Sequence, residues 1–242
     1  MHHWIATPVF AVLLIVFSGL AAASDYAREK KWADEILPNV VVGDPVYLSQ
    51  ANGHKALGIY ATATNAKAGV VVAHGIGVHP DHGIIGVLRQ RLVDFGFTTL
   101  SVQMPILAVD ADPAAYVPTF PEAAERLRLA VAFLKGKGAA SIVLVTQSLG
   151  SRMAYEYMKT NPAEVKAWAS LGMSSPGYET VRAPVLDLYG ERDLPQVVAG
   201  ARSRLASMGG APHSRQVVVP SADHFFTDRE EEMLIVLREF LK

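Results

Sequence analysis

The chain contains no cysteine among its 242 residues. Disulfide bonds, thiolate metal sites and a cysteine nucleophile are therefore excluded. Runs of lysine or arginine are also missing and the formal net charge is −1, so neither a nucleic-acid partner nor an anionic membrane surface is predicted. There is no internal repeat or low-complexity linker. Half of the residues are apolar, which is enough to bury the core of one α/β domain.

The most apolar stretch lies at the start of the chain. Residues 4–20 read WIATPVFAVLLIVFSGL, and three alanines follow. Such a run is typical of a signal peptide, so we expect residues 1–23 to be cleaved before Ser24 and the mature protein to be periplasmic or secreted, with no stable membrane span. The start, MHH, lacks lysine and arginine. An uncleaved N-terminal membrane anchor is the alternative, because residues 4–23 could span a bilayer.

The remaining sequence alternates between strand and helix patterns. Residues 24–40 are polar and predict an N-terminal arm or short helix. Two short extended runs flank Asn52-Gly53, which indicates a β-hairpin. Unbroken apolar runs then alternate with helical spacings up to a last helix, which is expected to begin at a capping box of Thr227 and Glu230. Residues 41–242 are therefore expected to form one α/β domain, with a mostly parallel sheet covered by helices on both faces.

A serine stands at an abrupt junction between a strand and a helix. Residues 143–150 read VLVTQSLG, and the helical spacing begins directly after Ser148. Ligands of parallel α/β sheets bind at the carboxyl ends of the strands. A sharp corner there exposes the hydroxyl and leaves the first amides of the helix free to donate. We expect Ser148 to be a nucleophile; the alternative is a helix N-cap.

The acid and the base that such a serine needs follow later strands. Asp193 comes after the run VLDLYG, with Asp187 and Glu191 as rivals, and His224 comes after RQVVV. The order serine, aspartate, histidine, each after a predicted strand, is that of the α/β-hydrolase triad. We therefore assign Ser148, Asp193 and His224 as candidate catalytic residues.

A second pair of histidines, His79 and His82, could suggest a metal site. No third ligand stands at a suitable spacing, so a solvated loop is expected instead. The proposed chemistry needs neither a metal nor a cofactor, and we expect the partner to be a small-molecule acyl substrate. The pattern predicts no oligomeric state.

Several motifs resemble the α/β-hydrolase superfamily across nearly all of residues 41–242. HG at 74–75, GxxD at 190–193 and DHFF at 223–226 are similar to small dienelactone-hydrolase-like members. HGIGVHPDHG and TTLSVQMP resemble a group of exported bacterial hydrolase-like proteins. The resemblance implies a serine hydrolase that cleaves a carboxylic ester or a related acyl bond.

The same resemblance implies roles for the residues around the serine. The backbone N–H groups of Leu149 and Ile76 would form an oxyanion hole, and His74 and Gly75 would lie in the substrate-binding region. One residue departs from the superfamily pattern G-x-S-x-G, because Thr146 stands at the position of the first glycine. Dienelactone hydrolases proper use a cysteine nucleophile, so that specific activity is not expected here.

The length of one connection bears on substrate size. A strand ends near Met173 and the next begins near Val185, which is too short a segment for a pair of helices. We therefore expect no cap domain. The loop 105–120 is the remaining candidate wall of the cleft. Its apolar residues are expected to form a shallow substrate-binding rim; they are Ile106, Leu107, Tyr116 and Phe120.

Three other functions stay open at this point. A peptidase or an acyltransferase would use the same triad. A non-catalytic α/β-hydrolase-like binding protein of the cell envelope is favoured only by Thr146. A membrane-anchored scaffold would require the first 23 residues to remain attached.

Overall fold

The computed structural model describes residues 24–174, 177–209 and 212–242. The expected signal peptide, residues 1–23, lies outside the described residues. Within these ranges, no helix has the length and apolar character needed to cross a membrane.

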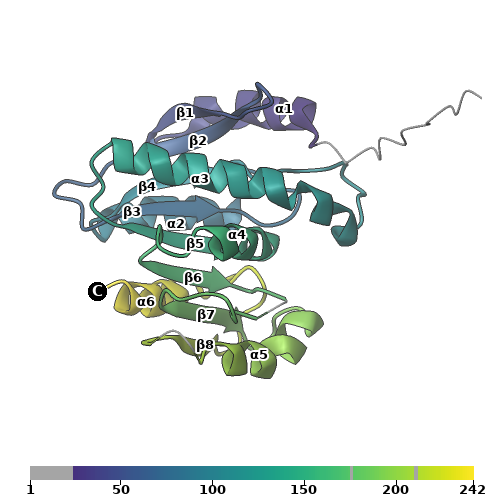
Figure 1. The fold of residues 1–242 in the computed structure, drawn as a ribbon, viewed down its shortest axis with the longest axis vertical. Coiled ribbons are helices and arrows are strands. Elements are labelled where there is room, and N and C mark those ends of the chain that lie inside the picture. The colour runs from purple at the N-terminus through teal and green to yellow at the C-terminus, as the bar shows by residue number, and fades with distance from the viewer. Residues whose placement is uncertain (1–23, 175–176, 210–211) are drawn as a thin grey trace, which may run out of the picture.

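The described residues form an alternating series of strands and helices (Figure 1). The helices are α1 (Tyr26–Ile36), α2 (Gly83–Asp94), α3 (Phe120–Gly136), α4 (Leu149–Thr160), α5 (Pro195–Ser207) and α6 (Glu230–Phe240), with 3₁₀ turns η1 (Leu37–Asn39) and η2 (Pro113–Thr119). The strands are β1 (Asp44–Ser49), β2 (Lys55–Ala61), β3 (Gly69–Ala73), β4 (Thr98–Val102), β5 (Ile142–Gln147), β6 (Ala167–Leu171), β7 (Val185–Gly190) and β8 (Arg215–Val219).

The strands form one eight-stranded sheet in the order β1-β2-β4-β3-β5-β6-β7-β8. Strands β1 and β2 form the expected antiparallel hairpin, and β2 pairs antiparallel with β4. All other neighbours, from β4 to β8, are parallel. The carboxyl ends of six strands therefore point to one edge of the sheet, which confirms the mostly parallel α/β architecture.

Each face of the sheet buries its own hydrophobic cluster. Successive residues of β3 point to opposite faces, as the pleat of a strand requires. Val70 and Val72 pack with α2 and α6, whereas Val71 and Ala73 pack with α3 and α4. Figure 1 shows α3 and α4 in front of the sheet and α2 and α6 behind it. Helices cover both faces, as predicted.

The N-terminal arm is helical and joins the sheet through buried charges. Glu29 of α1 forms an ion pair with the fully buried Arg126 of α3 at 3.0 Å, and Arg126 also pairs with Glu122 at 2.6 Å. Burial raises the pKa of Glu29, and the nearby Arg126 acts in the opposite direction. His54 in the hairpin turn lies 2.9 Å from the same glutamate. The arm is thus tied to both the hairpin and α3.

Two sequence-based expectations about helices need correction. The last helix, α6, begins at Glu230 after Arg229, and no side chain caps its start. The capping box of Thr227 and Glu230 is therefore wrong. Helix α5 was not among the expected elements, because one of its three buried positions is Arg204 and the apolar spacing is weak. Between β6 and β7 the described residues form no helix, in agreement with the expected lack of a cap.

Candidate active site

Ser148 occupies a strained corner between β5 and α4. Its backbone angles are φ 56° and ψ −124°, in a region that residues with a Cβ rarely adopt. Such a conformation costs about 1–3 kcal/mol and persists only where the surroundings enforce it. The Ser148 N–H donates to the carbonyl oxygen of Leu171 on β6 at 2.7 Å, which fixes the corner to the neighbouring strand.

Gly150 allows the helix to start close to the sheet. A Cβ at this position would lie 2.3 Å from the carbonyl oxygen of His74 and 2.9 Å from that of Ala73. No side chain fits there. The final glycine of the motif is therefore required by the contact between α4 and the end of β3.

Thr146 stands at the position of the first glycine of G-x-S-x-G, and two hydrogen bonds hold its side chain in place. Its hydroxyl accepts from the indole Nε1 of Trp168 at 2.8 Å and lies 2.8 Å from the hydroxyl of Ser151. All three residues are fully buried. The bulkier side chain thus links β5, β6 and the first turn of α4, and the corner keeps its shape.

The structure brings the three candidate catalytic side chains into one hydrogen-bonded chain. His224 Nε2 lies 2.9 Å from Ser148 Oγ, and His224 Nδ1 lies 2.6 Å from Asp193 Oδ1. Asp193 and His224 are both buried, whereas Ser148 is partly exposed. The carboxylate also accepts backbone N–H groups, from Leu194 at 2.7 Å and from Gly190 at 3.3 Å. These bonds hold the carboxylate in place for the imidazole.

The rival acids have other partners. Asp187 is fully buried, forms an ion pair with Arg204 at 3.0 Å and accepts from the hydroxyl of Tyr178 at 2.8 Å. Burial raises the pKa of Asp187, against the effect of Arg204. Glu191 accepts the backbone N–H of Ser221 at 2.8 Å. Of these three acids, Asp193 is the one that contacts the histidine.

The loop that carries His224 is shaped by its neighbours. Asp223 accepts the backbone N–H groups of Phe225 and Thr227, both at 2.9 Å, and these bonds lower its pKa although burial acts in the opposite direction. Asp223 is thus a turn residue beside the histidine. The side chain of Gln147 donates to the carbonyl oxygen of His224 at 3.4 Å. The residue before the candidate nucleophile therefore contacts the loop of the candidate base.

The two candidate oxyanion donors come from two different segments that line the cleft with the serine. Leu149 is the first residue of α4, and Ile76 follows the end of β3; both line the cleft that contains Ser148. Within the described residues, neither backbone N–H has a hydrogen-bond acceptor in the protein. Both groups are therefore available to a ligand.

His74 stabilises the loop that carries Ile76 and does not line the cleft. It is fully buried; its Nδ1–H donates to the carbonyl oxygen of Gly75 at 2.8 Å, and its Nε2 accepts the N–H of Met104 at 2.9 Å. Burial lowers the pKa of His74 to about 3, so the ring is neutral near pH 7. Gly75 is also buried, and a Cβ there would lie 3.0 Å from Ser148 Cβ. The expectation that His74 and Gly75 contact substrate is corrected: both are packing residues beneath the site.

The N-terminal arm also contacts the loop that carries Ile76. Arg28 of α1 donates to the carbonyl oxygens of Gly77 at 3.1 Å and Leu107 at 2.7 Å. Its guanidinium lies 4.3 Å from the ring centroid of Trp32. No sequence pattern predicts this contact, because Arg28 is 49 residues from Gly77 and 79 residues from Leu107 along the chain.

A small open cleft of about 120 Å³ surrounds Ser148 and His224. Its apolar walls include Ile76, Pro113 and Leu194. A larger hollow of about 550 Å³ lies at the opposite edge of the sheet, where the parallel strands begin. The chemistry points to the smaller cleft, since the candidate triad lies there.

The expected apolar rim does not exist as predicted. Ile106, Leu107 and Tyr116 are 0%, 6% and 1% exposed and belong to the core. Phe120 is partly buried at the start of α3, with its ring 5.4 Å from the guanidinium of Arg152. These four residues were expected in the rim because they are apolar and follow a strand. The loop instead folds inward, where the Tyr116 hydroxyl accepts the N–H of Leu107 at 3.0 Å.

The walls include three polar residues that the sequence analysis did not single out: Arg152, Ser174 and Gln196. Arg152 is the fourth residue of the helix that begins directly after Ser148. Its place near the start of that helix, at the carboxyl end of β5, was a usable signal. Ser174 and Gln196 follow the ends of β6 and β7 and carried none.

No protein-family model and no curated protein matches the chain in sequence comparisons. Solved structures do match. A dienelactone hydrolase from Anabaena variabilis is 21% identical with a TM-score of 0.68, covering 81% of this chain and 95% of that chain. Est1E from Butyrivibrio proteoclasticus is 14% identical with a TM-score of 0.65, covering 81% and 97%. The esterase Pf2001 from Pyrococcus furiosus is 13% identical with a TM-score of 0.63, covering 82% and 91%. At such identities the similarity establishes the fold alone, and the chain has the α/β-hydrolase fold.

Proposed function

We propose that the protein is a serine hydrolase that cleaves carboxylic esters, or related acyl bonds, through an acyl-enzyme on Ser148. The observation that carries the proposal is the chain of hydrogen bonds from Asp193 through His224 to the Ser148 hydroxyl, at 2.6 and 2.9 Å. The structural neighbours described as esterases and as a dienelactone hydrolase support cleavage of an ester bond.

The geometry fits nucleophilic catalysis with general base assistance. His224 Nε2 takes the proton of the Ser148 hydroxyl as the oxygen attacks the substrate carbonyl, and Asp193 holds the imidazole by its Nδ1–H and stabilises the imidazolium. The imidazolium then gives its proton to the leaving alcohol oxygen. In the second half of the reaction, His224 Nε2 takes a proton from water as the water oxygen attacks the acyl carbonyl. The imidazolium then gives that proton to Ser148 Oγ as the bond to the acyl carbon breaks, which releases the acid and restores the serine.

The negative charge that develops on the carbonyl oxygen needs donors fixed in advance. The free N–H groups of Leu149 and Ile76 would supply them. One such donor contributes about 3 kcal/mol to transition-state stabilisation. The bracing of the Ile76 loop by His74 and Arg28 then matters for catalysis, since a displaced donor loses much of this effect.

Labelling by a fluorophosphonate, which phosphonylates activated serines, tests the proposal directly. The protein should be labelled stoichiometrically and should hydrolyse p-nitrophenyl acetate, and Ser148→Ala should abolish both. His224→Ala should lower the rate by about 10⁴-fold or more, because the hydroxyl is weakly nucleophilic without its base. Ser174→Ala, in the wall of the same cleft, is the matched control and should retain labelling. Persistent labelling of Ser148→Ala would assign the nucleophile elsewhere.

The same experiments separate the other candidate functions. A non-catalytic binding protein would leave the wild-type chain unlabelled. A peptidase or acyltransferase would be labelled but would turn over peptides or transfer the acyl group to an added alcohol in preference to hydrolysing simple esters.

We also propose that the protein is exported and that residues 1–23 are removed. The apolar run with its alanine-rich end supports this. Intact mass of protein recovered from the periplasm or the medium should correspond to a chain that begins at Ser24. Full-length protein found only in membranes would favour the anchored alternative.

A further inference from the structure

A positive charge lies in the wall of the cleft, close to the serine. Arg152 is the fourth residue of α4, which begins directly after Ser148, and both residues line the same cleft. The cleft that the two residues share has a volume of only about 120 Å³. An arginine in its wall can therefore reach a group that is only a few bonds from a carbonyl held at Ser148.

This charge has no counter-charge in the described part of the chain. None of the ion pairs there involves Arg152, and its buried Nε has no hydrogen-bond partner. Among the described residues, none that lines the cleft is acidic. A buried donor without an acceptor is unfavourable, and such groups in proteins usually have a partner. A ligand is the partner that an open cleft can supply.

The guanidinium is also held in place. Its Cζ lies 5.4 Å from the ring centroid of Phe120, within the range of a cation–π contact. An arginine fixed in this way presents a planar set of donors that matches a carboxylate with two parallel hydrogen bonds.

We propose that Arg152 binds a carboxylate of the substrate, so that the enzyme prefers small esters that carry an acid group a few bonds from the scissile carbonyl. This inference rests on the proposed ester hydrolysis at Ser148. The cleft volume of about 120 Å³ limits the acid-bearing part to a small one. The formal net charge of the chain is −1, so a preference for anions must come from a local group and not from the overall field.

The test compares ester pairs that differ only in charge. 4-Acetoxybenzoate and 4-acetoxybenzamide place the carboxylate or its neutral amide on the leaving group. Monomethyl glutarate and methyl 4-carbamoylbutanoate place it on the acyl group. In at least one pair we expect the wild-type KM to be about 10- to 100-fold lower for the acid, the range for a charge-assisted bidentate contact.

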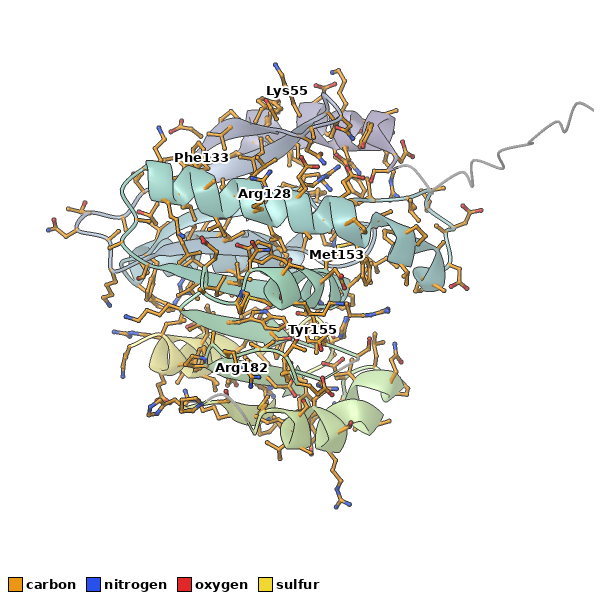
Figure 2. The ribbon with its side chains drawn as sticks, in the orientation of Figure 1. Lys55, Arg128, Phe133, Met153, Tyr155 and Arg182 are labelled. Atoms are coloured by element: carbon orange, nitrogen blue, oxygen red, sulfur yellow. The ribbon has the colours of Figure 1, made fainter. Side chains whose placement is uncertain are left out.

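Arg152→Gln should abolish this preference, measured as the ratio of the KM values for the acid and its neutral amide, so that the acids lose far more than the neutral esters. Arg152→Lys should retain part of it, since the charge remains without the planar set of donors. The KM for the acid should rise with added salt, and that for the neutral ester should not. Arg128→Gln on α3 is the matched control, because it removes one exposed positive charge outside the cleft (Figure 2); it should keep the preference.

Three results would overturn the inference: no preference in either pair, an equal loss for acids and neutral esters in Arg152→Gln, or the same loss of preference in Arg128→Gln. The proposed function is tested separately. Hydrolysis of the neutral esters that disappears in Ser148→Ala supports the serine hydrolase whatever Arg152 does, and hydrolysis that survives in Ser148→Ala contradicts it.

Discussion

Gly172 lies against the imidazole of His224. A Cβ on Gly172 would be 2.9 Å from both Cε1 and Nδ1 of the ring and 3.3 Å from Asp193 Oδ2. The backbone of Gly172 has φ +61°, a conformation that favours glycine. Because Gly172 has no side chain, the chain after β6 leaves room for the side chains of both His224 and Asp193.

We predict that Gly172→Ala impairs catalysis more than folding. The added methyl must push the imidazole away from Ser148, and small misplacements of a catalytic group can lower rates by about 10²-fold. We expect kcat/KM for p-nitrophenyl acetate to fall by about 10- to 100-fold and the free energy of unfolding to fall by about 1–2 kcal/mol. Steady-state kinetics and urea unfolding measure the two effects.

Gly53→Ala is the control for backbone strain. Gly53 has φ +86° in the turn of the hairpin, and nothing lies within 4 Å of its added Cβ. This variant should lose a similar amount of stability and keep full activity. Equal activity losses in the two variants would show that strain, and not the contact with His224, explains the effect.

The triad could be predicted because its geometry follows from chain order. In a parallel sheet, residues just after successive strands converge on one edge. Ser148, Asp193 and His224 each follow a strand, so the sequence was enough to place them together. The hairpin at Asn52-Gly53 could also be predicted, because it depends only on the turn preference of these two residues.

The walls of the cleft could not be predicted, since they depend on how loops fold back. Ile106 is apolar and follows β4, which suggested an exposed rim. Its carbonyl oxygen instead accepts the backbone N–H of Asp25 at 2.7 Å, and α1 covers the loop. That contact joins segments far apart in sequence. Helix α5 was not predicted for a related reason, because Arg204 on its buried face forms an ion pair with Asp187 on β7.

Thr146→Val should destabilise the fold without changing its shape. Valine fills the same space but removes the hydroxyl that accepts from Trp168 Nε1. A buried donor left without a partner costs about 1–3 kcal/mol. We expect urea unfolding to show a loss of this size, while Thr146→Ser, which keeps the hydroxyl, should retain more of the stability. If the valine variant is as stable as the wild type, Thr146 contributes only packing.

The buried His74 should make stability depend on pH. Its pKa is lowered from 6.5 to about 3 by burial. Between these values the unfolded chain binds a proton at this residue and the folded chain does not, so the free energy of unfolding rises with pH. The contribution is fully present above pH 6.5 and is lost as pH falls toward 3, by up to about 1.4 kcal/mol per pH unit.

His74→Gln removes this titration, so the slope of stability against pH between 6.5 and 5 should become smaller than in the wild type. His213→Gln, at an exposed position, is the matched control and should keep the wild-type slope. Urea unfolding at several pH values measures both. Parallel slopes in the wild type and His74→Gln would show that the ring takes up a proton in the folded protein as well.

The size of the cleft predicts which neutral acyl chains the enzyme prefers. Ligand pockets that bury a whole molecule have volumes of about 300–1,000 Å³, whereas this cleft has about 120 Å³. Ile76 and Leu194 in its walls remain 36% and 40% exposed. A methylene that becomes fully buried contributes about 0.8 kcal/mol, or roughly fourfold in kcat/KM, but one that extends into water contributes almost nothing. In a p-nitrophenyl ester series, kcat/KM should peak between acetate and butyrate and should not rise toward laurate. A steady increase of about fourfold per methylene up to laurate would mean that another segment closes over Ser148 when substrate binds, and the open cleft would then be a property of the free enzyme only.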